Sequence, residues 1–295
     1  MKRRFSAWKE EFIMEKSIKR YMPIFVLPTF FAFILGFIVP FIMGIWLSFC
    51  KFTTVTDAKF VGFSNYIEAL KDTAFRHSFW YTVLFAIASL LIINIIAFAL
   101  AMALTKEMHG TNVFRTIFFM PNLIGGIVLG YIWQLIFNGV LSRYGTALAL
   151  NEWYGFWGLI ILVSWQQIGY MMIIYIAGLQ SIPGDVIEAA EIDGAAKWDI
   201  LWKIRVPMVM SSITICVFLT LTNSFKLFDQ NLALTGGDPN HATEMLALNI
   251  YQTFYARAGM QWKGYGQAKA VIFCVLVIII SLVQLKATRS KEVQQ

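Results

Sequence analysis

The sequence predicts an all-α integral membrane protein with six transmembrane helices. Of its 295 residues 58% are hydrophobic and only 14% are charged, whereas a typical soluble chain is about half apolar and about a quarter charged. A helix needs about 20 apolar residues to cross the roughly 30 Å core of a bilayer. Six segments contain no Asp, Glu, Lys, Arg or His: 21–50, 78–105, 116–142, 153–184, 206–225 and 270–285. The first five are long enough as they stand.

Residues 1–20 precede the first span and carry seven Lys and Arg residues. Phe5, Trp8 and Phe12 recur at helical spacing among them, which predicts an amphipathic helix at the membrane surface. A disordered basic leader is the alternative. We therefore divide the chain into a cytoplasmic N-terminal segment 1–20, a transmembrane domain 21–285 and a basic cytoplasmic tail 286–295.

The first two predicted spans cover about 24–49 and 79–104. Pro28 and Pro40 favour a kink in the first span. Asn94 is the polar residue in the middle of the second. An amide in lipid needs a hydrogen-bond partner, so we expect Asn94 to face another helix.

Small residues mark the third span, and a charge marks the sixth. Gly125, Gly126 and Gly130 form a face on which another helix could approach closely. The sixth charge-free run has 16 residues, which is too short, so the span is predicted to begin near Tyr265. Lys269 would then either reach the headgroups or face protein.

The fourth span, about 156–182, contains a cluster of polar and aromatic residues: Trp165, Gln166, Gln167 and Tyr170. Adjacent glutamines at membrane depth are costly unless they line a cavity or bond another helix. Both interpretations remain open. Amides can bond sugar hydroxyls, and aromatic rings can stack on sugar faces, so the cluster is a candidate sugar pocket. The fifth span, about 207–225, ends in a second polar group that includes Asn223 and Ser224.

The loop between these two spans, 183–207, has clear helix signals. Asp185, with Glu188 three residues later, predicts a capped helix start. Gly194 permits a sharp turn, and a second short helix is predicted over 195–204. Pro207 suits the first turn of the fifth span. The sequence thus predicts two short helices held rigidly between two membrane spans.

The spacing in this loop resembles the EAA loop of ABC importer permeases. The matching residues are Glu188, Ala189, Ala190, Gly194, Ile204, Val206 and Pro207. Val206 stands where the family usually has Leu. The segments 114–122 and 234–239 also resemble the carbohydrate-uptake group, the binding-protein-dependent permeases of maltose and multiple-sugar type, although Asp238 replaces a usual Gly. The resemblance covers about residues 20–290. It implies a type I importer permease whose cytoplasmic coupling loop joins spans 4 and 5.

This resemblance implies roles for particular residues. Coupling to an ATPase would fall to Glu188, Ala189, Ala190, Asp193, Gly194, Ile204 and Pro207. Substrate binding would fall to Trp165, Gln166, Gln167, Tyr170, Asn223 and Ser224. The implied partners are a second permease, usually a different chain with its own EAA loop, two ATPase subunits and an extracytoplasmic sugar-binding protein.

Catalysis is not expected of this chain. It contains no Gly-x4-Gly-Lys-Ser/Thr phosphate loop, so ATP and Mg²⁺ would be bound by the partner ATPase. No spacing of His, Cys and carboxylates suggests a metal site or a catalytic site. Nucleic acid is not an expected partner, because the basic residues are spread over the membrane flanks.

Basic residues also predict the orientation. With both termini inside, the inner segments hold 15 Lys and Arg in 65 residues, and the outer segments hold nine in 85. Basic residues favour the cytoplasmic side. We therefore expect a multi-pass protein of the bacterial plasma membrane with cytoplasmic termini and a cytoplasmic coupling loop.

Three alternatives remain. An importer of an anionic sugar derivative, such as a sugar phosphate or a uronate oligomer, would want a cation in a span, and Lys226 is the nearest candidate. A channel or receptor subunit without a motor would not need the EAA-type loop. A multi-pass membrane enzyme would need acids, His or Cys gathered at one interface, and the sequence shows no such group.

Overall fold

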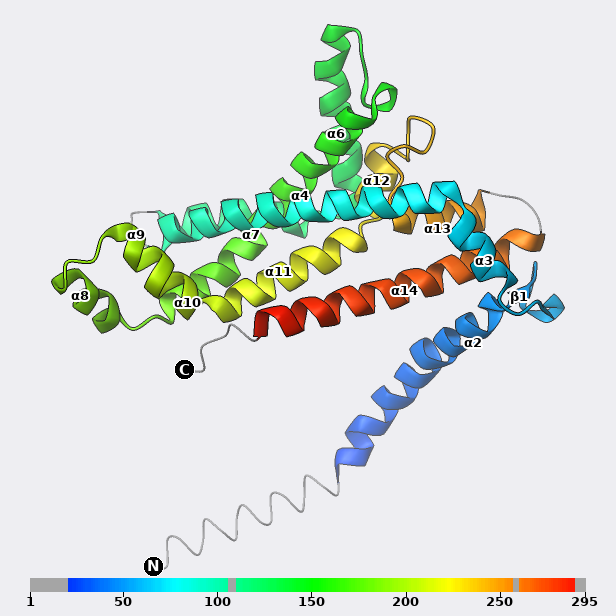
Figure 1. The fold of residues 1–295 in the computed structure, drawn as a ribbon, viewed down its shortest axis with the longest axis horizontal. Helices are drawn as coiled ribbons and strands as arrows, with labels where there is room; N and C mark the ends of the chain where they lie inside the picture. The colour runs from blue at the N-terminus through cyan, green and yellow to red at the C-terminus, as the bar shows by residue number, and fades with distance from the viewer. Residues whose placement is uncertain (1–20, 106–109, 257–259, 290–295) are drawn as a thin grey trace, which may run out of the picture.

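The structure is a computed structural model, and it describes residues 21–105, 110–256 and 260–289. The predictions for residues 1–20 and for the end of the tail, 290–295, lie outside these ranges. The described chain is almost entirely helical (Figure 1). Helix α8 lies at one end of the main bundle and helix α3 at the other (Figure 1). These are named below the α8 end and the α3 end.

Long helices form the body of the molecule and run side by side in Figure 1. They are α4 (Thr73–Leu104), α7 (Glu152–Gln180), α11 (Met210–Phe225) and α14 (Met260–Arg289). The other α-helices are α2 (Val39–Ser48), α3 (Ser64–Lys71), α5 (Thr111–Phe119), α6 (Gly126–Leu141), α8 (Gly184–Ile192), α9 (Lys197–Asp199), α10 (Val206–Met208), α12 (Asp229–Leu234) and α13 (Leu246–Tyr255).

Short 3₁₀-helical and π-helical segments lie between these α-helices or interrupt them. The 3₁₀ turns are η2 (Val55–Asp57), η3 (Met120–Leu123), η4 (Ser142–Tyr144) and η5 (Leu148–Leu150), and the π-helical segments are η1 (Ile34–Ile38) and η6 (Ile200–Arg205). Strands β1 (Cys50–Lys51) and β2 (Lys59–Phe60) form an antiparallel pair in which Cys50 lies opposite Phe60.

Four described helices are long and apolar enough to cross a membrane: Tyr21–Ser48, Thr73–Leu104, Glu152–Gln180 and Lys263–Thr288. Two bent pairs bring the number to six if each pair counts as one span. They are Thr111–Leu123 with Gly126–Tyr144, bent by 100°, and Lys197–Met208 with Met210–Phe225, bent by 71°. The apolar runs did not indicate either bend, because hydropathy records length and composition but not direction.

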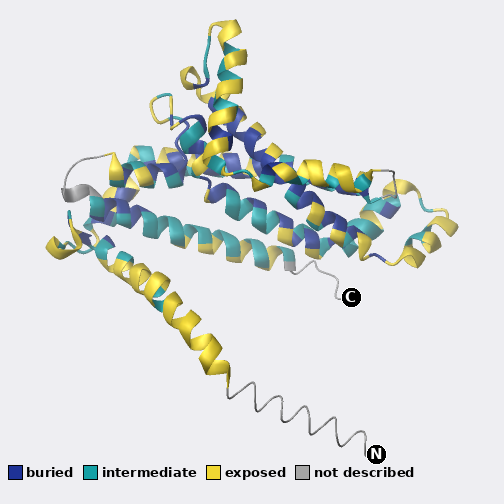
Figure 2. Cartoon of the chain, turned by 180° about the vertical axis from the view of Figure 1, so that it is seen from behind, coloured by how far each residue is buried: buried dark blue, intermediate teal, exposed yellow. Residues whose placement is uncertain are grey.

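The N-terminal part of the first span stands away from the rest of the molecule (Figure 2), whereas its end, α2, lies against α14, where a Cβ on Gly44 would meet Gln267. None of its most apolar window is buried in the chain, and Phe25 is 76% exposed. The π-helical segment η1 ends two residues before Pro40. That proline was expected to perturb the helix, because its ring excludes a backbone hydrogen bond.

Asn94 joins three of the long helices, as expected. Its side-chain amide donates to Thr220 Oγ1 on α11 at 3.2 Å. Its oxygen accepts from the Tyr175 hydroxyl on α7 at 2.7 Å. The polar residue in the middle of α4 therefore holds α7 and α11 against it, which confirms the predicted helix–helix contact.

Lys269 faces protein and is fully buried. Its ammonium group donates to Asp72 Oδ2 at 2.8 Å, Asn249 Oδ1 at 2.9 Å and Thr253 Oγ1 at 3.1 Å. It also lies 4.5 Å from the centre of the Tyr265 ring. Of the two expectations for this residue, the interior position is the correct one. The ion pair joins α14 to the start of α4 at the α3 end, and the hydrogen bonds to Asn249 and Thr253 join it to α13.

Asp72 is the acidic member of this ion pair and is also the N-cap of α4. Its Oδ1 accepts a hydrogen bond from the backbone amide of Ala74 at 2.9 Å. Burial raises the pKa of the Asp72 carboxyl, but hydrogen bonds from Lys269 and Tyr265 and the charge of Lys269 outweigh this effect. The pKa falls from 3.8 to about 2. The stabilisation that the carboxylate contributes is therefore complete above about pH 4 and is lost as the pH falls toward 2.

Replacing Asp72 with Asn should destabilise the protein by about 3 kcal/mol, because a buried ammonium loses its counterion. The double variant Asp72→Asn with Lys269→Met should lose less than the sum of the two single changes. Thermal unfolding in detergent measures both effects. The wild type should also lose more stability than Asp72→Asn between pH 4 and pH 2. Additive losses and parallel pH curves would show that the pair does not stabilise the fold.

Candidate functional site

The site begins at the bend in the third span, where α5 packs against α7. Gly169 of α7 touches the backbone of α5, and a Cβ at this position would overlap the carbonyl oxygen of Phe118. The chain then passes through buried Pro121 and turns by 100° before α6 begins at Gly126. The bend leaves backbone groups without helical partners, and such groups must be satisfied within the protein at membrane depth.

Gln166 supplies a partner at this bend. Its amide nitrogen donates to the backbone oxygen of Ile124 at 3.1 Å. Its amide oxygen accepts from Gln230 Nε2 of α12 at 2.7 Å. Both ends of the side chain are therefore engaged, and Gln166 links α7, the bend and α12.

Helix α12 packs closely against α6 at Gly130, and a side-chain hydrogen bond from Gln134 adds to this contact. A Cβ on Gly130 would lie 2.6 Å from Cβ of Ala233, so the predicted small-residue face is used here. Gln134 Nε2 donates to the backbone oxygen of Leu234 at 3.0 Å. These contacts hold the end of α12 against α6.

A polar pocket of about 320 Å³ lies where these elements meet. Its lining consists of Asn122, Gln166, Gln167, Asn223, Lys226, Leu227, Phe228, Asp229 and Gln230. Gln167 is 8% exposed, and its amide oxygen is buried without a hydrogen-bond partner among the described residues. A ligand hydroxyl is the kind of group that would satisfy such an acceptor.

The structure gathers only part of the predicted substrate set in this pocket. Gln166, Gln167 and Asn223 line it. Trp165 is 44% exposed and packs edge-on against Trp133, with 5.5 Å between ring centres. Tyr170 lies against Phe119. These two aromatic residues therefore flank the polar lining and do not belong to it.

Ser224 does not fit the predicted role. It is fully buried, and its hydroxyl donates to the backbone oxygen of Thr220 one turn earlier at 2.8 Å. Asn223, its neighbour, faces the pocket because successive helical residues point about 100° apart. The prediction placed both residues in the pocket without allowing for this rotation.

Sequence reasoning missed Asn122, Asp229 and Gln230. Asn122 follows Pro121, and a proline–polar pair inside an apolar run is a signal of a broken span. Asp229 and Gln230 lie beyond the fifth span, in a segment that looked like an external loop. The chain returns there as the short helix α12, which a hydropathy window cannot detect.

The loop 183–207 forms two helical stretches at the α8 end (Figure 1). Helix α8 has no buried residue, and Ile192 is 86% exposed. Gly194 has φ of +78°, a conformation that other residues rarely adopt. The second stretch runs from α9 through η6 and α10, with a 2.6 Å ion pair between Lys203 and Asp199. The predicted pair of short helices is thus observed.

Two details of the predicted loop were wrong. Pro183 is the N-cap of α8, and no side chain caps the helix, so Asp185 lies inside its first turn. The second helical stretch also continues through Pro207 to Met208, and the bend comes at Val209. Pro207 sits at the start of α10, where its missing N–H is tolerated.

Comparison with known proteins identifies the chain. The family model described as "Binding-protein-dependent transport system inner membrane component" matches residues 95–289. The chain belongs to this family. Members are membrane components of transport systems, so this is a multi-pass transport subunit and not an enzyme. The family expected from the EAA-type spacing is thereby confirmed.

Individual relatives of this transport component match over nearly their full length. The probable starch degradation products transport system permease protein AmyD of Thermoanaerobacterium thermosulfurigenes is 42% identical over 92% of this chain and 94% of its own. The multiple sugar-binding transport system permease protein MsmF of Streptococcus mutans is 31% identical, with the same coverage.

The fold is also known from experiment. A bacterial ABC transporter involved in the import of the acidic polysaccharide alginate has a chain that superimposes with a TM-score of 0.77 at 20% identity. The match covers 94% of this chain and 98% of the other. The importer permease fold expected from the sequence is therefore confirmed.

Replacing Gly169 with Ala should cost about 3 kcal/mol, because the new methyl group meets backbone that cannot move aside without shifting α5. Gly139→Ala in α6 is the matched control: nothing lies within 4 Å of its added Cβ. That change should be neutral or stabilise by up to about 1 kcal/mol. Thermal unfolding of both variants in detergent provides the measurement, and equal effects would contradict the close α5–α7 contact.

Proposed function

We propose that this chain is the permease subunit of an ATP-driven importer of a sugar or an oligosaccharide. The observation that carries the proposal is the pocket at the bend of the third span, which is lined by neutral amides and includes the unpartnered oxygen of Gln167. Sugars offer many hydroxyl donors and acceptors to such groups. The names of the relatives AmyD and MsmF, which refer to starch degradation products and multiple sugars, support the same substrate class.

The charges in the pocket favour a neutral substrate. Lys226 and Asp229 both line it and both are exposed. Lys226 could receive the acidic group of a sugar phosphate or uronate, the alternative substrate class. Asp229 would repel the same group, since like charges at close range are unfavourable. A polar pocket with balanced charge suits a neutral sugar better.

Gln167→Leu should lower sugar uptake at least about tenfold, because a hydroxyl donor of the bound sugar would face an apolar group in a buried position. Uptake of labelled malto-oligosaccharide by cells that express the complete transporter is the measurement. Ser224→Ala, which alters a buried hydroxyl bonded within its own helix, is the control and should transport normally. Normal uptake by Gln167→Leu would exclude the pocket as the sugar site.

The loop at the α8 end is the proposed coupling element. Helix α8 contains Glu188, Ala189 and Ala190, and the turn that follows it contains Asp193 and Gly194. Ile204 and Pro207 lie in the second helical stretch. The exposure of α8 suits insertion into a groove of a partner ATPase, which would bind ATP and Mg²⁺. This orientation puts both chain termini in the cytoplasm and the α3 end outside, facing a sugar-binding protein.

A second permease is the proposed partner within the membrane. The first span buries none of its apolar window against its own chain, and α6 also projects from the body (Figure 1). Both helices offer surfaces on which another EAA-bearing chain could pack. The resulting pair would enclose the pathway and carry one coupling loop for each of two ATPase subunits.

Coupling requires the loop to move as a rigid piece. Shifting a two-state transporter from 1:99 to 99:1 requires about 5.5 kcal/mol of differential binding. The two stretches of the loop follow directly from α7 and lead directly into α11. Gln167 lies on α7 and Asn223 on α11. A displacement of the loop would therefore move both helices and change the lining of the pocket.

Glu188→Lys combined with Gly194→Pro should abolish co-purification of the ATPase from native membranes, because the changes reverse a surface charge and forbid the positive φ of the turn. Mass identification of what accompanies the tagged chain is the measurement. Glu68→Lys at the α3 end, also exposed, is the charge-matched control and should retain the ATPase. Unchanged ATPase recovery from the double variant would favour a subunit without a motor.

A further inference from the structure

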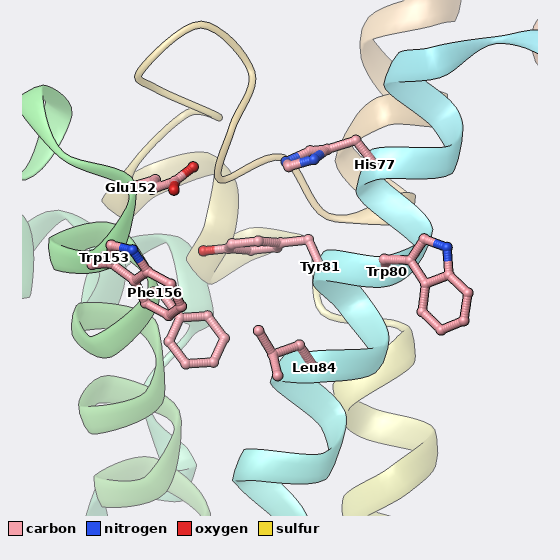
Figure 3. Close-up of a pocket in the computed structure, with 7 residues that line it drawn as sticks. All are labelled: His77, Trp80, Tyr81, Leu84, Glu152, Trp153 and Phe156. Atoms are coloured by element: carbon pink, nitrogen blue, oxygen red, sulfur yellow. The ribbon is translucent and has the colours of Figure 1, made fainter.

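A second cavity, separate from the polar pocket, opens between α4 and α7 at the α3 end (Figure 3). Its volume is about 230 Å³, whereas one water requires roughly 10–15 Å³ on a comparable measure. His77, Tyr81 and Leu84 of α4 line one side. Glu152, Trp153 and Phe156 of α7 line the other.

Aromatic rings form the walls of this cavity. Tyr81 meets Phe156 edge to face at 5.7 Å between ring centres, and Phe156 meets Trp153 in the same way at 5.9 Å. His77 stacks over Tyr81 at 6.2 Å and is held by a 2.9 Å contact between its Nε2 and the backbone oxygen of Ala242. These contacts fix the rings before any ligand arrives.

The hydroxyl of Tyr81 is a buried polar group without a partner. The residue is 9% exposed, and its oxygen has no hydrogen-bond partner among the described residues. In Figure 3 this oxygen points across the cavity toward the side of α7 that carries Glu152 and Phe156. Buried hydroxyls are normally hydrogen-bonded, so the unpaired group is available to bond a ligand in the cavity.

The lining favours a cation. Glu152 supplies a carboxylate, and no Lys or Arg lies in the lining. Aromatic faces attract ammonium groups, and such rings form the cages that bind quaternary ammonium ligands. Tyr81 Oη can in addition accept an N–H from a primary ammonium. The chemistry therefore fits an organic ammonium group.

The surroundings indicate that a lipid carries this group. Trp80, at the rim, is 68% exposed, and apolar exposed residues continue from it along one face of α4: Leu84 at 46%, Ile87 at 54% and Leu91 at 53%. Their spacing of three and four residues makes a continuous stripe along a membrane span. Trp80 and exposed Trp153 suit the headgroup level of a bilayer.

We propose that this cavity binds the ammonium headgroup of a zwitterionic aminophospholipid, with an acyl chain lying along the stripe on α4. Glu152 would neutralise the ammonium charge, and Tyr81 would accept one of its N–H groups. The site is independent of sugar binding and of the coupling loop.

Native mass spectrometry of the purified full chain can test this proposal with three lipids: phosphatidylethanolamine, phosphatidylcholine and phosphatidylglycerol. Both ammonium lipids should bind about tenfold or more tightly than phosphatidylglycerol, and Glu152→Gln should remove this preference. Glu68→Gln, at an exposed glutamate outside the cavity, should keep it. Thermal unfolding of each variant verifies that it is folded.

Tyr81→Phe keeps the ring and removes the hydroxyl. It should weaken binding of phosphatidylethanolamine severalfold and leave phosphatidylcholine unchanged, because a trimethylammonium group has no N–H to donate. Equal binding of all three lipids, or a preference that survives Glu152→Gln, would overturn the proposal. Competition by free ethanolamine at the affinity of the lipid would overturn the lipid assignment, since the acyl stripe would then contribute nothing.

Discussion

The hydrogen bond from Gln166 to the backbone oxygen of Ile124 supports the arrangement around the candidate pocket. A helix that bends by 100° within a membrane span exposes backbone groups that lipid cannot satisfy. Gln166 supplies one missing partner and is itself oriented by Gln230. The bend, the position of α12 and the polar pocket therefore depend on one another, and a single side chain on α7 connects them.

Elsewhere in the bundle, polar groups also define which helices meet. Asn94 selects α7 and α11 as the neighbours of α4 through two hydrogen bonds. Lys269 selects α13 and the start of α4 as the neighbours of α14. Apolar side chains in lipid gain little from choosing one neighbour over another, so polar partners and close contacts at small residues provide the specificity.

The order of elements explains how a distant loop could act on the pocket. Helix α7 carries Gln166 and Gln167 and then leads into α8. Helix α11 emerges from the second stretch of the loop and ends near Asn223 and the start of α12. The exposed loop is thus continuous with both pocket helices: the pocket lies midway along α7 and at the far end of α11. The aromatic cavity lined by Glu152, Trp153 and Phe156 lies at the start of α7, beyond the pocket.

The sequence by itself determined the class of protein, the number of apolar runs and the exposed pair of short helices at 183–207. These features are local: they depend on composition, run length and the spacing of Gly, Pro and acidic residues. It also marked Gln166 and Gln167 as polar residues that need a cavity or a partner. Only the tertiary structure decided which residues are the hydrogen-bond partners. The bend after Pro121, the return of Asp229 and Gln230 as α12, and the burial of Ser224 all depend on contacts between segments distant in the chain. Such contacts leave no local periodicity, because each is set by which neighbour satisfies a buried polar group.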